Sequence, residues 1–191
     1  MTAATILAGK RILVTRSRDQ ASRLSEQLAA HGAEPLEAPV LAKRACASHD
    51  DDARLRDLAS YDWVVLTSPN GVRFLADRLE TLGIEWPAAG PRVAVAGTST
   101  AWAAREQGWP VGIVPDRFVS ESLADALAER GISGAAVLVA RNVDGRPVLE
   151  ERLQDAGARV TRVGLYETHP REATAPLLAR LAAEDVDAIT V

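Results

Sequence analysis

The chain has 191 residues, of which 47% are hydrophobic and 25% are charged, and its net charge is −4 at neutral pH. These values are typical of a globular protein with a packed core, and the lack of a Lys/Arg cluster disfavours a nucleic-acid-binding protein. Because Cys46 is the single cysteine and no apolar run approaches the ~20 residues that span a bilayer, we exclude a disulfide scaffold and a membrane-spanning protein and expect a cytoplasmic one.

Short apolar segments alternate with segments of helical periodicity along the whole chain. The predicted strands cover 11–16, 63–67, 92–96, 112–114, 136–140, 159–168 and 186–191, and residues 34–45 are extended but interrupted by Pro35 and Pro39. The predicted helices cover 19–30, 51–60, 71–82, 98–107, 120–129, 146–155 and 174–183. Strands separated by helices of this length predict βαβ units, and therefore an α/β fold of doubly wound parallel sheets.

The chain contains an internal repeat with an offset of 125 residues, which aligns segment 11–33 with segment 136–158. Nine positions are identical without a gap, where roughly two would agree by chance. These positions are Leu13/Leu138, Val14/Val139, Arg16/Arg141, Asp19/Asp144, Leu24/Leu149, Glu26/Glu151, Leu28/Leu153, Gly32/Gly157 and Ala33/Ala158. Many βαβ units share such strand, helix and glycine positions, but the arginine after each strand is not part of that general pattern.

The repeat predicts two flavodoxin- or Rossmann-like lobes, one inserted in the other. Residues 48–163 form the inserted middle lobe, and residues 1–37 and 171–191 form the outer lobe. The chain crosses twice between lobes, so we expect the extended segments 38–47 and 164–170 to pair as a two-stranded β connector; the alternative is two ordinary loops. At the same offset, segment 63–66 falls on 188–191. The second copy therefore stops before its functional loop, and we expect about 60 further residues beyond Val191.

Polar side chains follow the predicted strands at the ends where parallel sheets bind ligands. They are Arg16, Ser68, Asn70, Thr100 and Arg141. Helix capping alone explains the hydroxyl and amide groups, and strand-end ion pairs explain the arginines. Taken together, these side chains, free backbone N–H groups and positive helix ends along one rim of a lobe suit an anionic ligand.

Tyr166 lies on the second crossing, in the segment GLYETHP. Its ring could simply pack against the connector. The functional alternative is a hydroxyl that faces the space between the lobes, where a phenol is a hydrogen-bond donor or weak general acid.

Neither a metal nor a nucleotide cofactor is expected. The histidines His31, His49 and His169 are far apart and have no metal-ligand spacing. Residues 96–99 contain one glycine, Gly97, where the dinucleotide fingerprint needs three.

Five segments together resemble the uroporphyrinogen-III synthase family. They are ILVTR near the N-terminus, YDWVVLTSPNGVRFL at 61–75, VAVAGTSTAWAAREQG at 93–108, SESLADAL at 120–127 and GARVTRVGLYET at 157–168. The resemblance covers essentially the whole chain, in order, and TSPNGV and the Tyr-x-Thr segment at 166–168 are its most telling motifs. It implies two lobes joined by a two-stranded ladder.

The resemblance implies a cofactor-free hydro-lyase of tetrapyrrole and heme biosynthesis. Its substrate would be hydroxymethylbilane, which is dehydrated, inverted at ring D and closed to uroporphyrinogen III. Ser68 and Thr100 carry over from the family pattern as substrate-binding residues, and Tyr166 as the donor to the departing hydroxyl group. Asn70, Arg16 and Arg141 are added from their strand-end positions as binders of the substrate's side chains. We expect a monomer without nucleic-acid or membrane partners.

A different class of function is also compatible with the sequence. The alternative is a two-lobed module that binds a small anion by hinge closure, or serves as a regulatory domain, without catalysis. For a chain that stops at Val191 we further expect no activity, because an unpaired core strand would be exposed.

Overall fold

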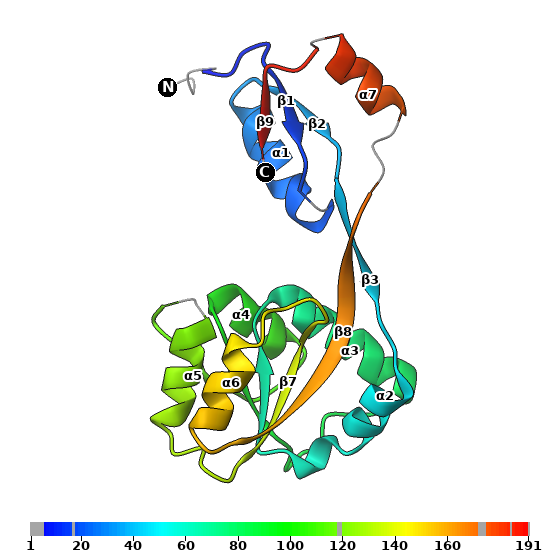
Figure 1. Cartoon of the computed structure of the whole chain (residues 1–191). Helices are drawn as coiled ribbons and strands as arrows, with labels where there is room; N and C mark the ends of the chain where they lie inside the picture. Colours follow the sequence, from blue (N-terminus) through cyan, green and yellow to red (C-terminus); the bar gives the residue numbers. More distant parts are fainter. Residues whose placement is uncertain (1–5, 17, 118–119, 172–174, 184, 191) are drawn as a thin grey trace. The chain divides into compact units, whose positions relative to one another are not determined.

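The computed structural model describes residues 6–16, 18–117, 120–171, 175–183 and 185–190. The chain divides into two compact units, which we name the split unit (residues 1–44 and 168–191) and the continuous unit (residues 45–167). The predicted α/β class with parallel sheets is confirmed (Figure 1). The boundaries of lobes and connector drawn from the repeat stay a prediction. Within the described ranges, no helix has the length and apolar character needed to cross a bilayer.

The split unit contains a sheet with the strand order β2-β1-β9, in which both strand pairs are parallel. Its elements are β1 (Arg11–Val14), α1 (Arg18–Ala30), β2 (Glu34–Glu37), α7 (Ala175–Ala182) and β9 (Ala188–Thr190). The central strand β1 is buried at Ile12, Leu13 and Val14. Pro35 has no N–H to donate, and β2 accommodates it because this strand lies at the edge of the sheet.

The larger sheet has the strand order β3-β8-β7-β4-β5-β6. Its strands and neighbouring helices are β3 (Leu41–Ala45), α2 (His49–Arg56), the 3₁₀ helix η1 (Leu58–Ser60), β4 (Trp63–Leu66), α3 (Pro69–Leu82), β5 (Arg92–Val95), α4 (Thr98–Glu106), β6 (Val111–Ile113), α5 (Ser120–Ala128), β7 (Ala136–Asn142), α6 (Val148–Asp155) and β8 (Arg159–Pro170). Strand β4 pairs in parallel with β5 and with β7. The strand order reverses between β4 and β7, and ligands bind at the carboxyl ends of strands beside such a reversal.

Helices cover both faces of this sheet, as the apolar strands predict. Val64 and Leu66 belong to the core under α2, α3 and α4, together with the fully buried Leu75. Trp63 and Val65 belong to the core on the other face, under α5 and α6, which lie side by side (Figure 1). Because the strands are buried on both faces, polar groups can meet a ligand only at the ends of the sheet.

The two copies of the repeat have the same strand register. The pairs Ile12↔Ala188 and Leu13↔Ile189 correspond to Val137↔Trp63 and Leu138↔Val64 at the offset of 125 residues. In the first pair of strands, Asp187 exchanges two bonds of 2.8 Å with the backbone of Arg11, one from its own N–H and one to its Oδ2. In the second, Asp62 makes the same two bonds of 2.8 Å with Ala136. The offset is therefore confirmed as a structural equivalence.

Several predicted boundaries differ from the structure, and the helix predicted over 51–60 is one example. The Ser48 hydroxyl accepts the Asp51 N–H at 3.0 Å and starts α2 earlier, and Asp57 is both the C-cap of α2 and the N-cap of η1. Strand β8 continues to Pro170, through the segment 164–170 that was predicted to be extended. It neighbours β3, and backbone bonds join Cys46 N–H to Leu165 O at 2.9 Å and Arg171 N–H to Val40 O at 2.7 Å.

Candidate functional site

Tyr166 and Ser68 meet at the carboxyl end of the sheet in the continuous unit. The Tyr166 hydroxyl lies 3.4 Å from Ser68 Oγ, and either group can donate. This separation exceeds the usual ~2.7–2.8 Å of an O–H···O bond, so a bound oxygen can compete for the phenolic hydrogen. The Tyr166 ring is 7% exposed and stacks on Phe74 of α3, with centroids 4.7 Å apart and planes inclined by 18°. This stacking fixes the direction of the hydroxyl group.

Ser68 also caps helix α3. Its Oγ accepts the Gly71 N–H at 3.1 Å, and Pro69 follows at the first helical position. Capping and a role at the site were alternatives in the sequence; the structure shows the cap and the contact with Tyr166, and the role of Ser68 in ligand binding stays a prediction. Asn70 occupies the next position of the first turn and is half-buried, and its side chain makes no hydrogen bond within the described ranges.

The N-terminus of α4 has no side-chain cap. Its N-cap is Gly97, and Thr98 and Ser99 in the first turn are exposed. No side chain therefore caps the N–H groups of this first turn, and the positive end of the helix dipole there suits a carboxylate. Strand β5 brings this helix beside β4, with the Ala96 N–H bonded to Leu66 O at 3.1 Å. Thr100, by contrast, is only 2% exposed, so protein encloses its side chain.

Arg141 forms an ion pair within the protein, which was the alternative to ligand binding that the sequence left open. Its Nη1 donates to the Glu150 carboxylate, 3.0 Å from Oε2 and 3.3 Å from Oε1, and to the Arg146 carbonyl at 2.9 Å. Arg16 is exposed, belongs to the split unit and forms no ion pair with any residue that the structure describes. The structure thus places Ser68, Asn70, Thr100, Arg141 and Tyr166 in one unit, and Arg16 in the other.

Sequence reasoning missed Phe74, Glu150 and Arg162. Phe74 orients the Tyr166 ring and carries the Arg73 guanidinium 4.9 Å above its centroid. Glu150 is 7% exposed, and Arg162 Nε lies 3.7 Å from its Oε1. The repeat contains a signal for Glu150 and Arg162. The equivalent positions of the first copy hold Ser25 and Glu37, so the charge differs between the two copies at both positions.

This group of residues offers hydrogen-bond donors rather than a strong acid or base. A phenol, a serine hydroxyl, an amide and an uncapped helix end can bind carboxylates and help an oxygen leaving group depart. They can also hold a flexible substrate in one conformation, which is itself a large contribution to rate.

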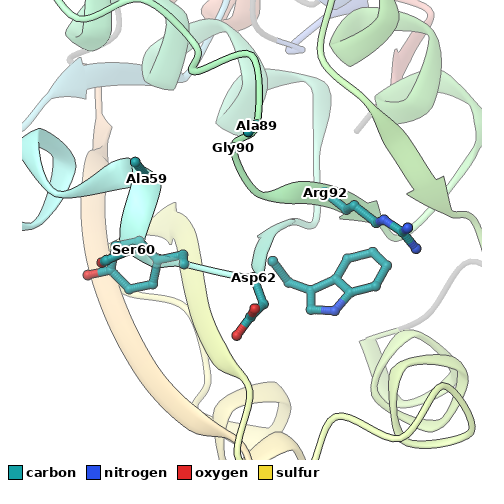
Figure 2. A pocket seen from close by; sticks show the side chains of 8 residues that line it. Ala59, Ser60, Asp62, Ala89, Gly90 and Arg92 are labelled. Atoms are coloured by element: carbon teal, nitrogen blue, oxygen red, sulfur yellow. The ribbon is translucent and has the colours of Figure 1, made fainter.

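A surface hollow of about 410 Å³ lies at the opposite end of the same sheet, where the strands begin (Figure 2). It lies where β4 and β5 begin, with Asp62 and Arg92 on its walls. Asp62 Oδ2 already accepts the Ala136 N–H at 2.8 Å, and the Arg92 guanidinium lies 5.9 Å from the Trp63 ring centroid. These groups serve strand pairing and packing, so we place the candidate site at the carboxyl edge.

Comparison with known proteins agrees with the motifs. A family model described as uroporphyrinogen-III synthase HemD matches residues 22–191. A uroporphyrinogen-III synthase from Synechococcus elongatus is 33% identical over 164 residues, which are 85% of this chain and 62% of that relative. A putative uroporphyrinogen-III synthase from Methanothermobacter thermautotrophicus is 32% identical over 187 residues, 93% of this chain and 71% of the relative. The chain therefore spans less than two thirds of the Synechococcus protein.

A solved structure has the same fold. A mutant uroporphyrinogen III synthase from Thermus thermophilus superposes with a TM-score of 0.68 at 24% identity, over 95% of this chain and 71% of that one. At this identity the likeness shows the fold alone. None of the comparisons supports the expected inactivity of a chain that stops at Val191.

Proposed function

The chain belongs to the uroporphyrinogen-III synthase family, and on that premise we propose that it converts hydroxymethylbilane to uroporphyrinogen III by dehydration, inversion of ring D and macrocycle closure. The observation that carries the proposal is the Tyr166 hydroxyl beside Ser68 Oγ, at the carboxyl edge of the sheet and in the motifs that carry the resemblance. The chemistry of the substrate fits the donors at this edge.

Hydroxymethylbilane carries an acetate and a propionate on each of its four pyrrole rings, so its binding requires many donors to carboxylates. The uncapped N-terminus of α4 supplies backbone N–H groups, and Ser68 and Asn70 add neutral side chains in the same unit. The predicted contact of Thr100 is not part of this proposal, because its side chain is buried. Arg16, which belongs to the split unit, remains a proposed binder of carboxylates because its guanidinium is a forked cation. Arg141 already has a carboxylate partner in Glu150, and we assign it a different role below.

The first chemical step is loss of the substrate hydroxyl. Electrons from the adjacent pyrrole nitrogen expel it, and the Tyr166 O–H donates to the departing oxygen so that it leaves as water rather than hydroxide. Ser68, at 3.4 Å, can return a hydrogen bond to the phenolic oxygen during this transfer. The enzyme must then hold the rings so that closure with inversion of ring D is faster than direct head-to-tail closure. That task is one of positioning and exclusion of water.

We further propose a cytoplasmic monomer that acts without nucleic-acid or membrane partners. A single cysteine and the lack of a basic cluster in the sequence support this proposal.

The function is tested with freshly prepared hydroxymethylbilane. We expect this chain to produce the type III isomer above the background of the type I isomer, which forms spontaneously; the products are oxidised to porphyrins and separated by chromatography. If only the type I isomer forms while the chain still binds the bilane, the alternative of a non-catalytic anion-binding module is supported instead.

The role of Tyr166 is tested by Tyr166→Phe, which keeps the ring stacked on Phe74 and removes only the hydroxyl. We expect the rate of type III formation to fall by about 10²-fold, the lower range for loss of a positioned proton donor. The matched control is Tyr61→Phe, which alters the chain's other tyrosine, at the opposite edge of the sheet. A Tyr166→Phe protein with the full rate would remove this residue from the mechanism.

A further inference from the structure

The two arginines of the repeat stand in different surroundings. Arg16, two residues after β1, and Arg141, near the end of β7, occupy equivalent positions of the repeat, and the two strands have the same register. Arg16 is exposed, whereas the Arg141 side chain is 12% exposed and forms an ion pair with Glu150. Because Arg16 and Arg141 are equivalent in the repeat but differ in their contacts, we expect them to have different tasks.

Glu150, which binds Arg141, and Arg162, which lies beside Glu150, occur in the second copy alone. Glu150 and Arg162 correspond to Ser25 and Glu37 of the first copy, where the Ser25 hydroxyl donates to the Glu37 carboxylate at 2.7 Å. Gly145 corresponds to Gln20. A Cβ atom at Gly145 would overlap the Arg141 guanidinium, so a glycine is needed there for the guanidinium to lie against the loop.

Glu150 holds two guanidinium groups. It is 7% exposed, receives two hydrogen bonds from Arg141 Nη1 and lies 3.7 Å from Arg162 Nε. Without this carboxylate, the largely buried Arg141 guanidinium would lie near the partly exposed Arg162 with no counter-charge between them, which is unfavourable. The two cations and the anion therefore act as one interdependent network.

The two guanidinium groups in turn bind one loop, residues 142–146, which joins β7 to α6. Arg141 Nη1 donates to the Arg146 carbonyl at 2.9 Å. Arg162 Nη2 donates to three further carbonyl oxygens of the loop, those of Asn142 (3.2 Å), Val143 and Gly145 (3.4 Å). Backbone carbonyls along the loop are thus held by side chains that Glu150 positions.

The loop is bonded directly to the backbone of Tyr166. The Val143 N–H donates to the Tyr166 carbonyl at 2.9 Å, and Asn142 is the strand partner of Tyr166 after an irregularity in the β7–β8 pairing. Arg162 itself lies on the same strand β8, four residues before Tyr166. A change in the loop is therefore transmitted to the residue that carries the candidate proton donor.

We propose that Glu150, through Arg141 and Arg162, is a positioning residue that clamps the 142–146 loop and thereby sets the location of Tyr166. Arg141 is part of this clamp and does not bind a substrate carboxylate, while Arg16, its exposed counterpart, keeps the anion-binding role. The catalytic part of this inference rests on the proposed function; the structural part does not.

The test compares Glu150→Gln with Glu151→Gln, an exposed neighbour on the same helix. We expect the backbone amides of residues 142–146 to exchange hydrogen at least tenfold faster in Glu150→Gln and at the original rate in Glu151→Gln. For type III formation we expect kcat to fall about tenfold with KM changed less than twofold. A misplaced donor stabilises the transition state less but leaves the binding of the substrate unchanged. Glu150→Asp, which retains the carboxylate, should recover part of both effects.

A second pair of variants covers the case in which Glu150→Gln fails to fold. Arg162→Lys keeps the charge beside Glu150 but loses the forked donors to the loop, and Arg152→Lys changes an exposed arginine paired with Asp125 on the surface. We expect faster loop exchange in Arg162→Lys alone.

Unchanged loop exchange in both clamp variants, Glu150→Gln and Arg162→Lys, would overturn the clamp, whether or not the chain is active. A raised KM with an unchanged kcat would overturn the positioning role. If no type III isomer forms even with the original sequence, the proposed function fails, and loop exchange still decides the clamp.

Discussion

At the scale of single residues, the Ser68 hydroxyl has a structural task as a helix cap and, in the proposed function, a chemical task as well. It accepts the Gly71 N–H that starts α3 and lies within reach of the Tyr166 hydroxyl. Since Phe74, one turn later on the same helix, stacks on the Tyr166 ring, the helix start and the phenol are positioned by the same element. An error in the cap would therefore displace the donor as well.

The double task of Ser68 is tested against a cap without a chemical role. Ser68→Ala and Ser48→Ala each remove a serine that caps a helix, α3 and α2 respectively. We expect each variant to lower the free energy of unfolding by about 1 kcal/mol, measured by urea denaturation. Only Ser68→Ala should also slow type III formation. Equal rates for the two variants would show that the Ser68 hydroxyl matters as a cap and in no other way.

At the scale of elements, the start of β1 is fastened to β9 by one carboxylate. Asp187 accepts hydrogen bonds of 2.8 Å from Lys10 Nζ and from the Arg11 N–H, and Arg11 also pairs with Asp185. The pKa of Asp187 lies below its ordinary value of 3.8. The largest cause is the hydrogen bond from Lys10, and the second is the hydrogen bond from the Arg11 N–H. The contact joins segments far apart in the chain, at the central strand of the sheet in the split unit.

The sign of the resulting pH dependence follows from the lowered pKa. A carboxylate whose pKa is lower in the folded state stabilises the fold above its unfolded pKa, and this stabilisation is lost as the pH falls through the folded value. We therefore expect Asp187→Asn to lower the urea midpoint at pH 7, and the difference from the original chain to shrink as the pH falls below 3.8. Glu26→Gln, an exposed carboxylate with no ion-pair partner in the described ranges, serves as the control. A difference that stays constant down to pH 2.5 would contradict the assignment.

At the scale of the whole molecule, the two units differ in the amount of structure around their central strands. In the continuous unit, β4 lies between β5 and β7 and is covered on both faces by apolar cores. In the split unit, β1 lies between the short strands β2 and β9, and Ile189 of β9 is 56% exposed. Stability need not be uniform over such a chain, because each unit can open by itself.

Hydrogen exchange measures this difference. We expect the amides of residues 11–14 in β1 to exchange at least about tenfold faster than those of residues 63–66 in β4. The comparison is internal, since both strands are central, parallel and four residues long. Equal protection of the two strands would show that the units unfold together, and greater protection of β1 would contradict the expected order of stability.

Much of the fold could be predicted because its signals are local or repeated. The alternation of apolar strands and amphipathic helices depends on burial within each element, and the 125-residue offset predicted that Asp62 and Asp187 are equivalent, which their identical backbone bonds confirm. The error over 51–60 also has a local cause, because Ser48 outside that range starts the helix. For the candidate site, strand ends predicted Ser68 and Asn70, and the second crossing with the family resemblance predicted Tyr166; the structure places all three in the continuous unit, and their roles stay a prediction.

The sequence by itself therefore determined the α/β class, the repeat and the edge of the sheet at which polar groups gather, because each of these follows from residue spacing. Only the tertiary structure decided which side chains are partners. The Tyr166 hydroxyl reaches Ser68 across 98 positions of the chain, and Arg141 turns to Glu150 and the 142–146 loop while the equivalent Arg16 stays exposed. Such contacts depend on strand order and on the space left by residues such as Gly145. Packing decides which groups lie within hydrogen-bond distance of a side chain, and therefore whether it binds a neighbour or is free for a substrate.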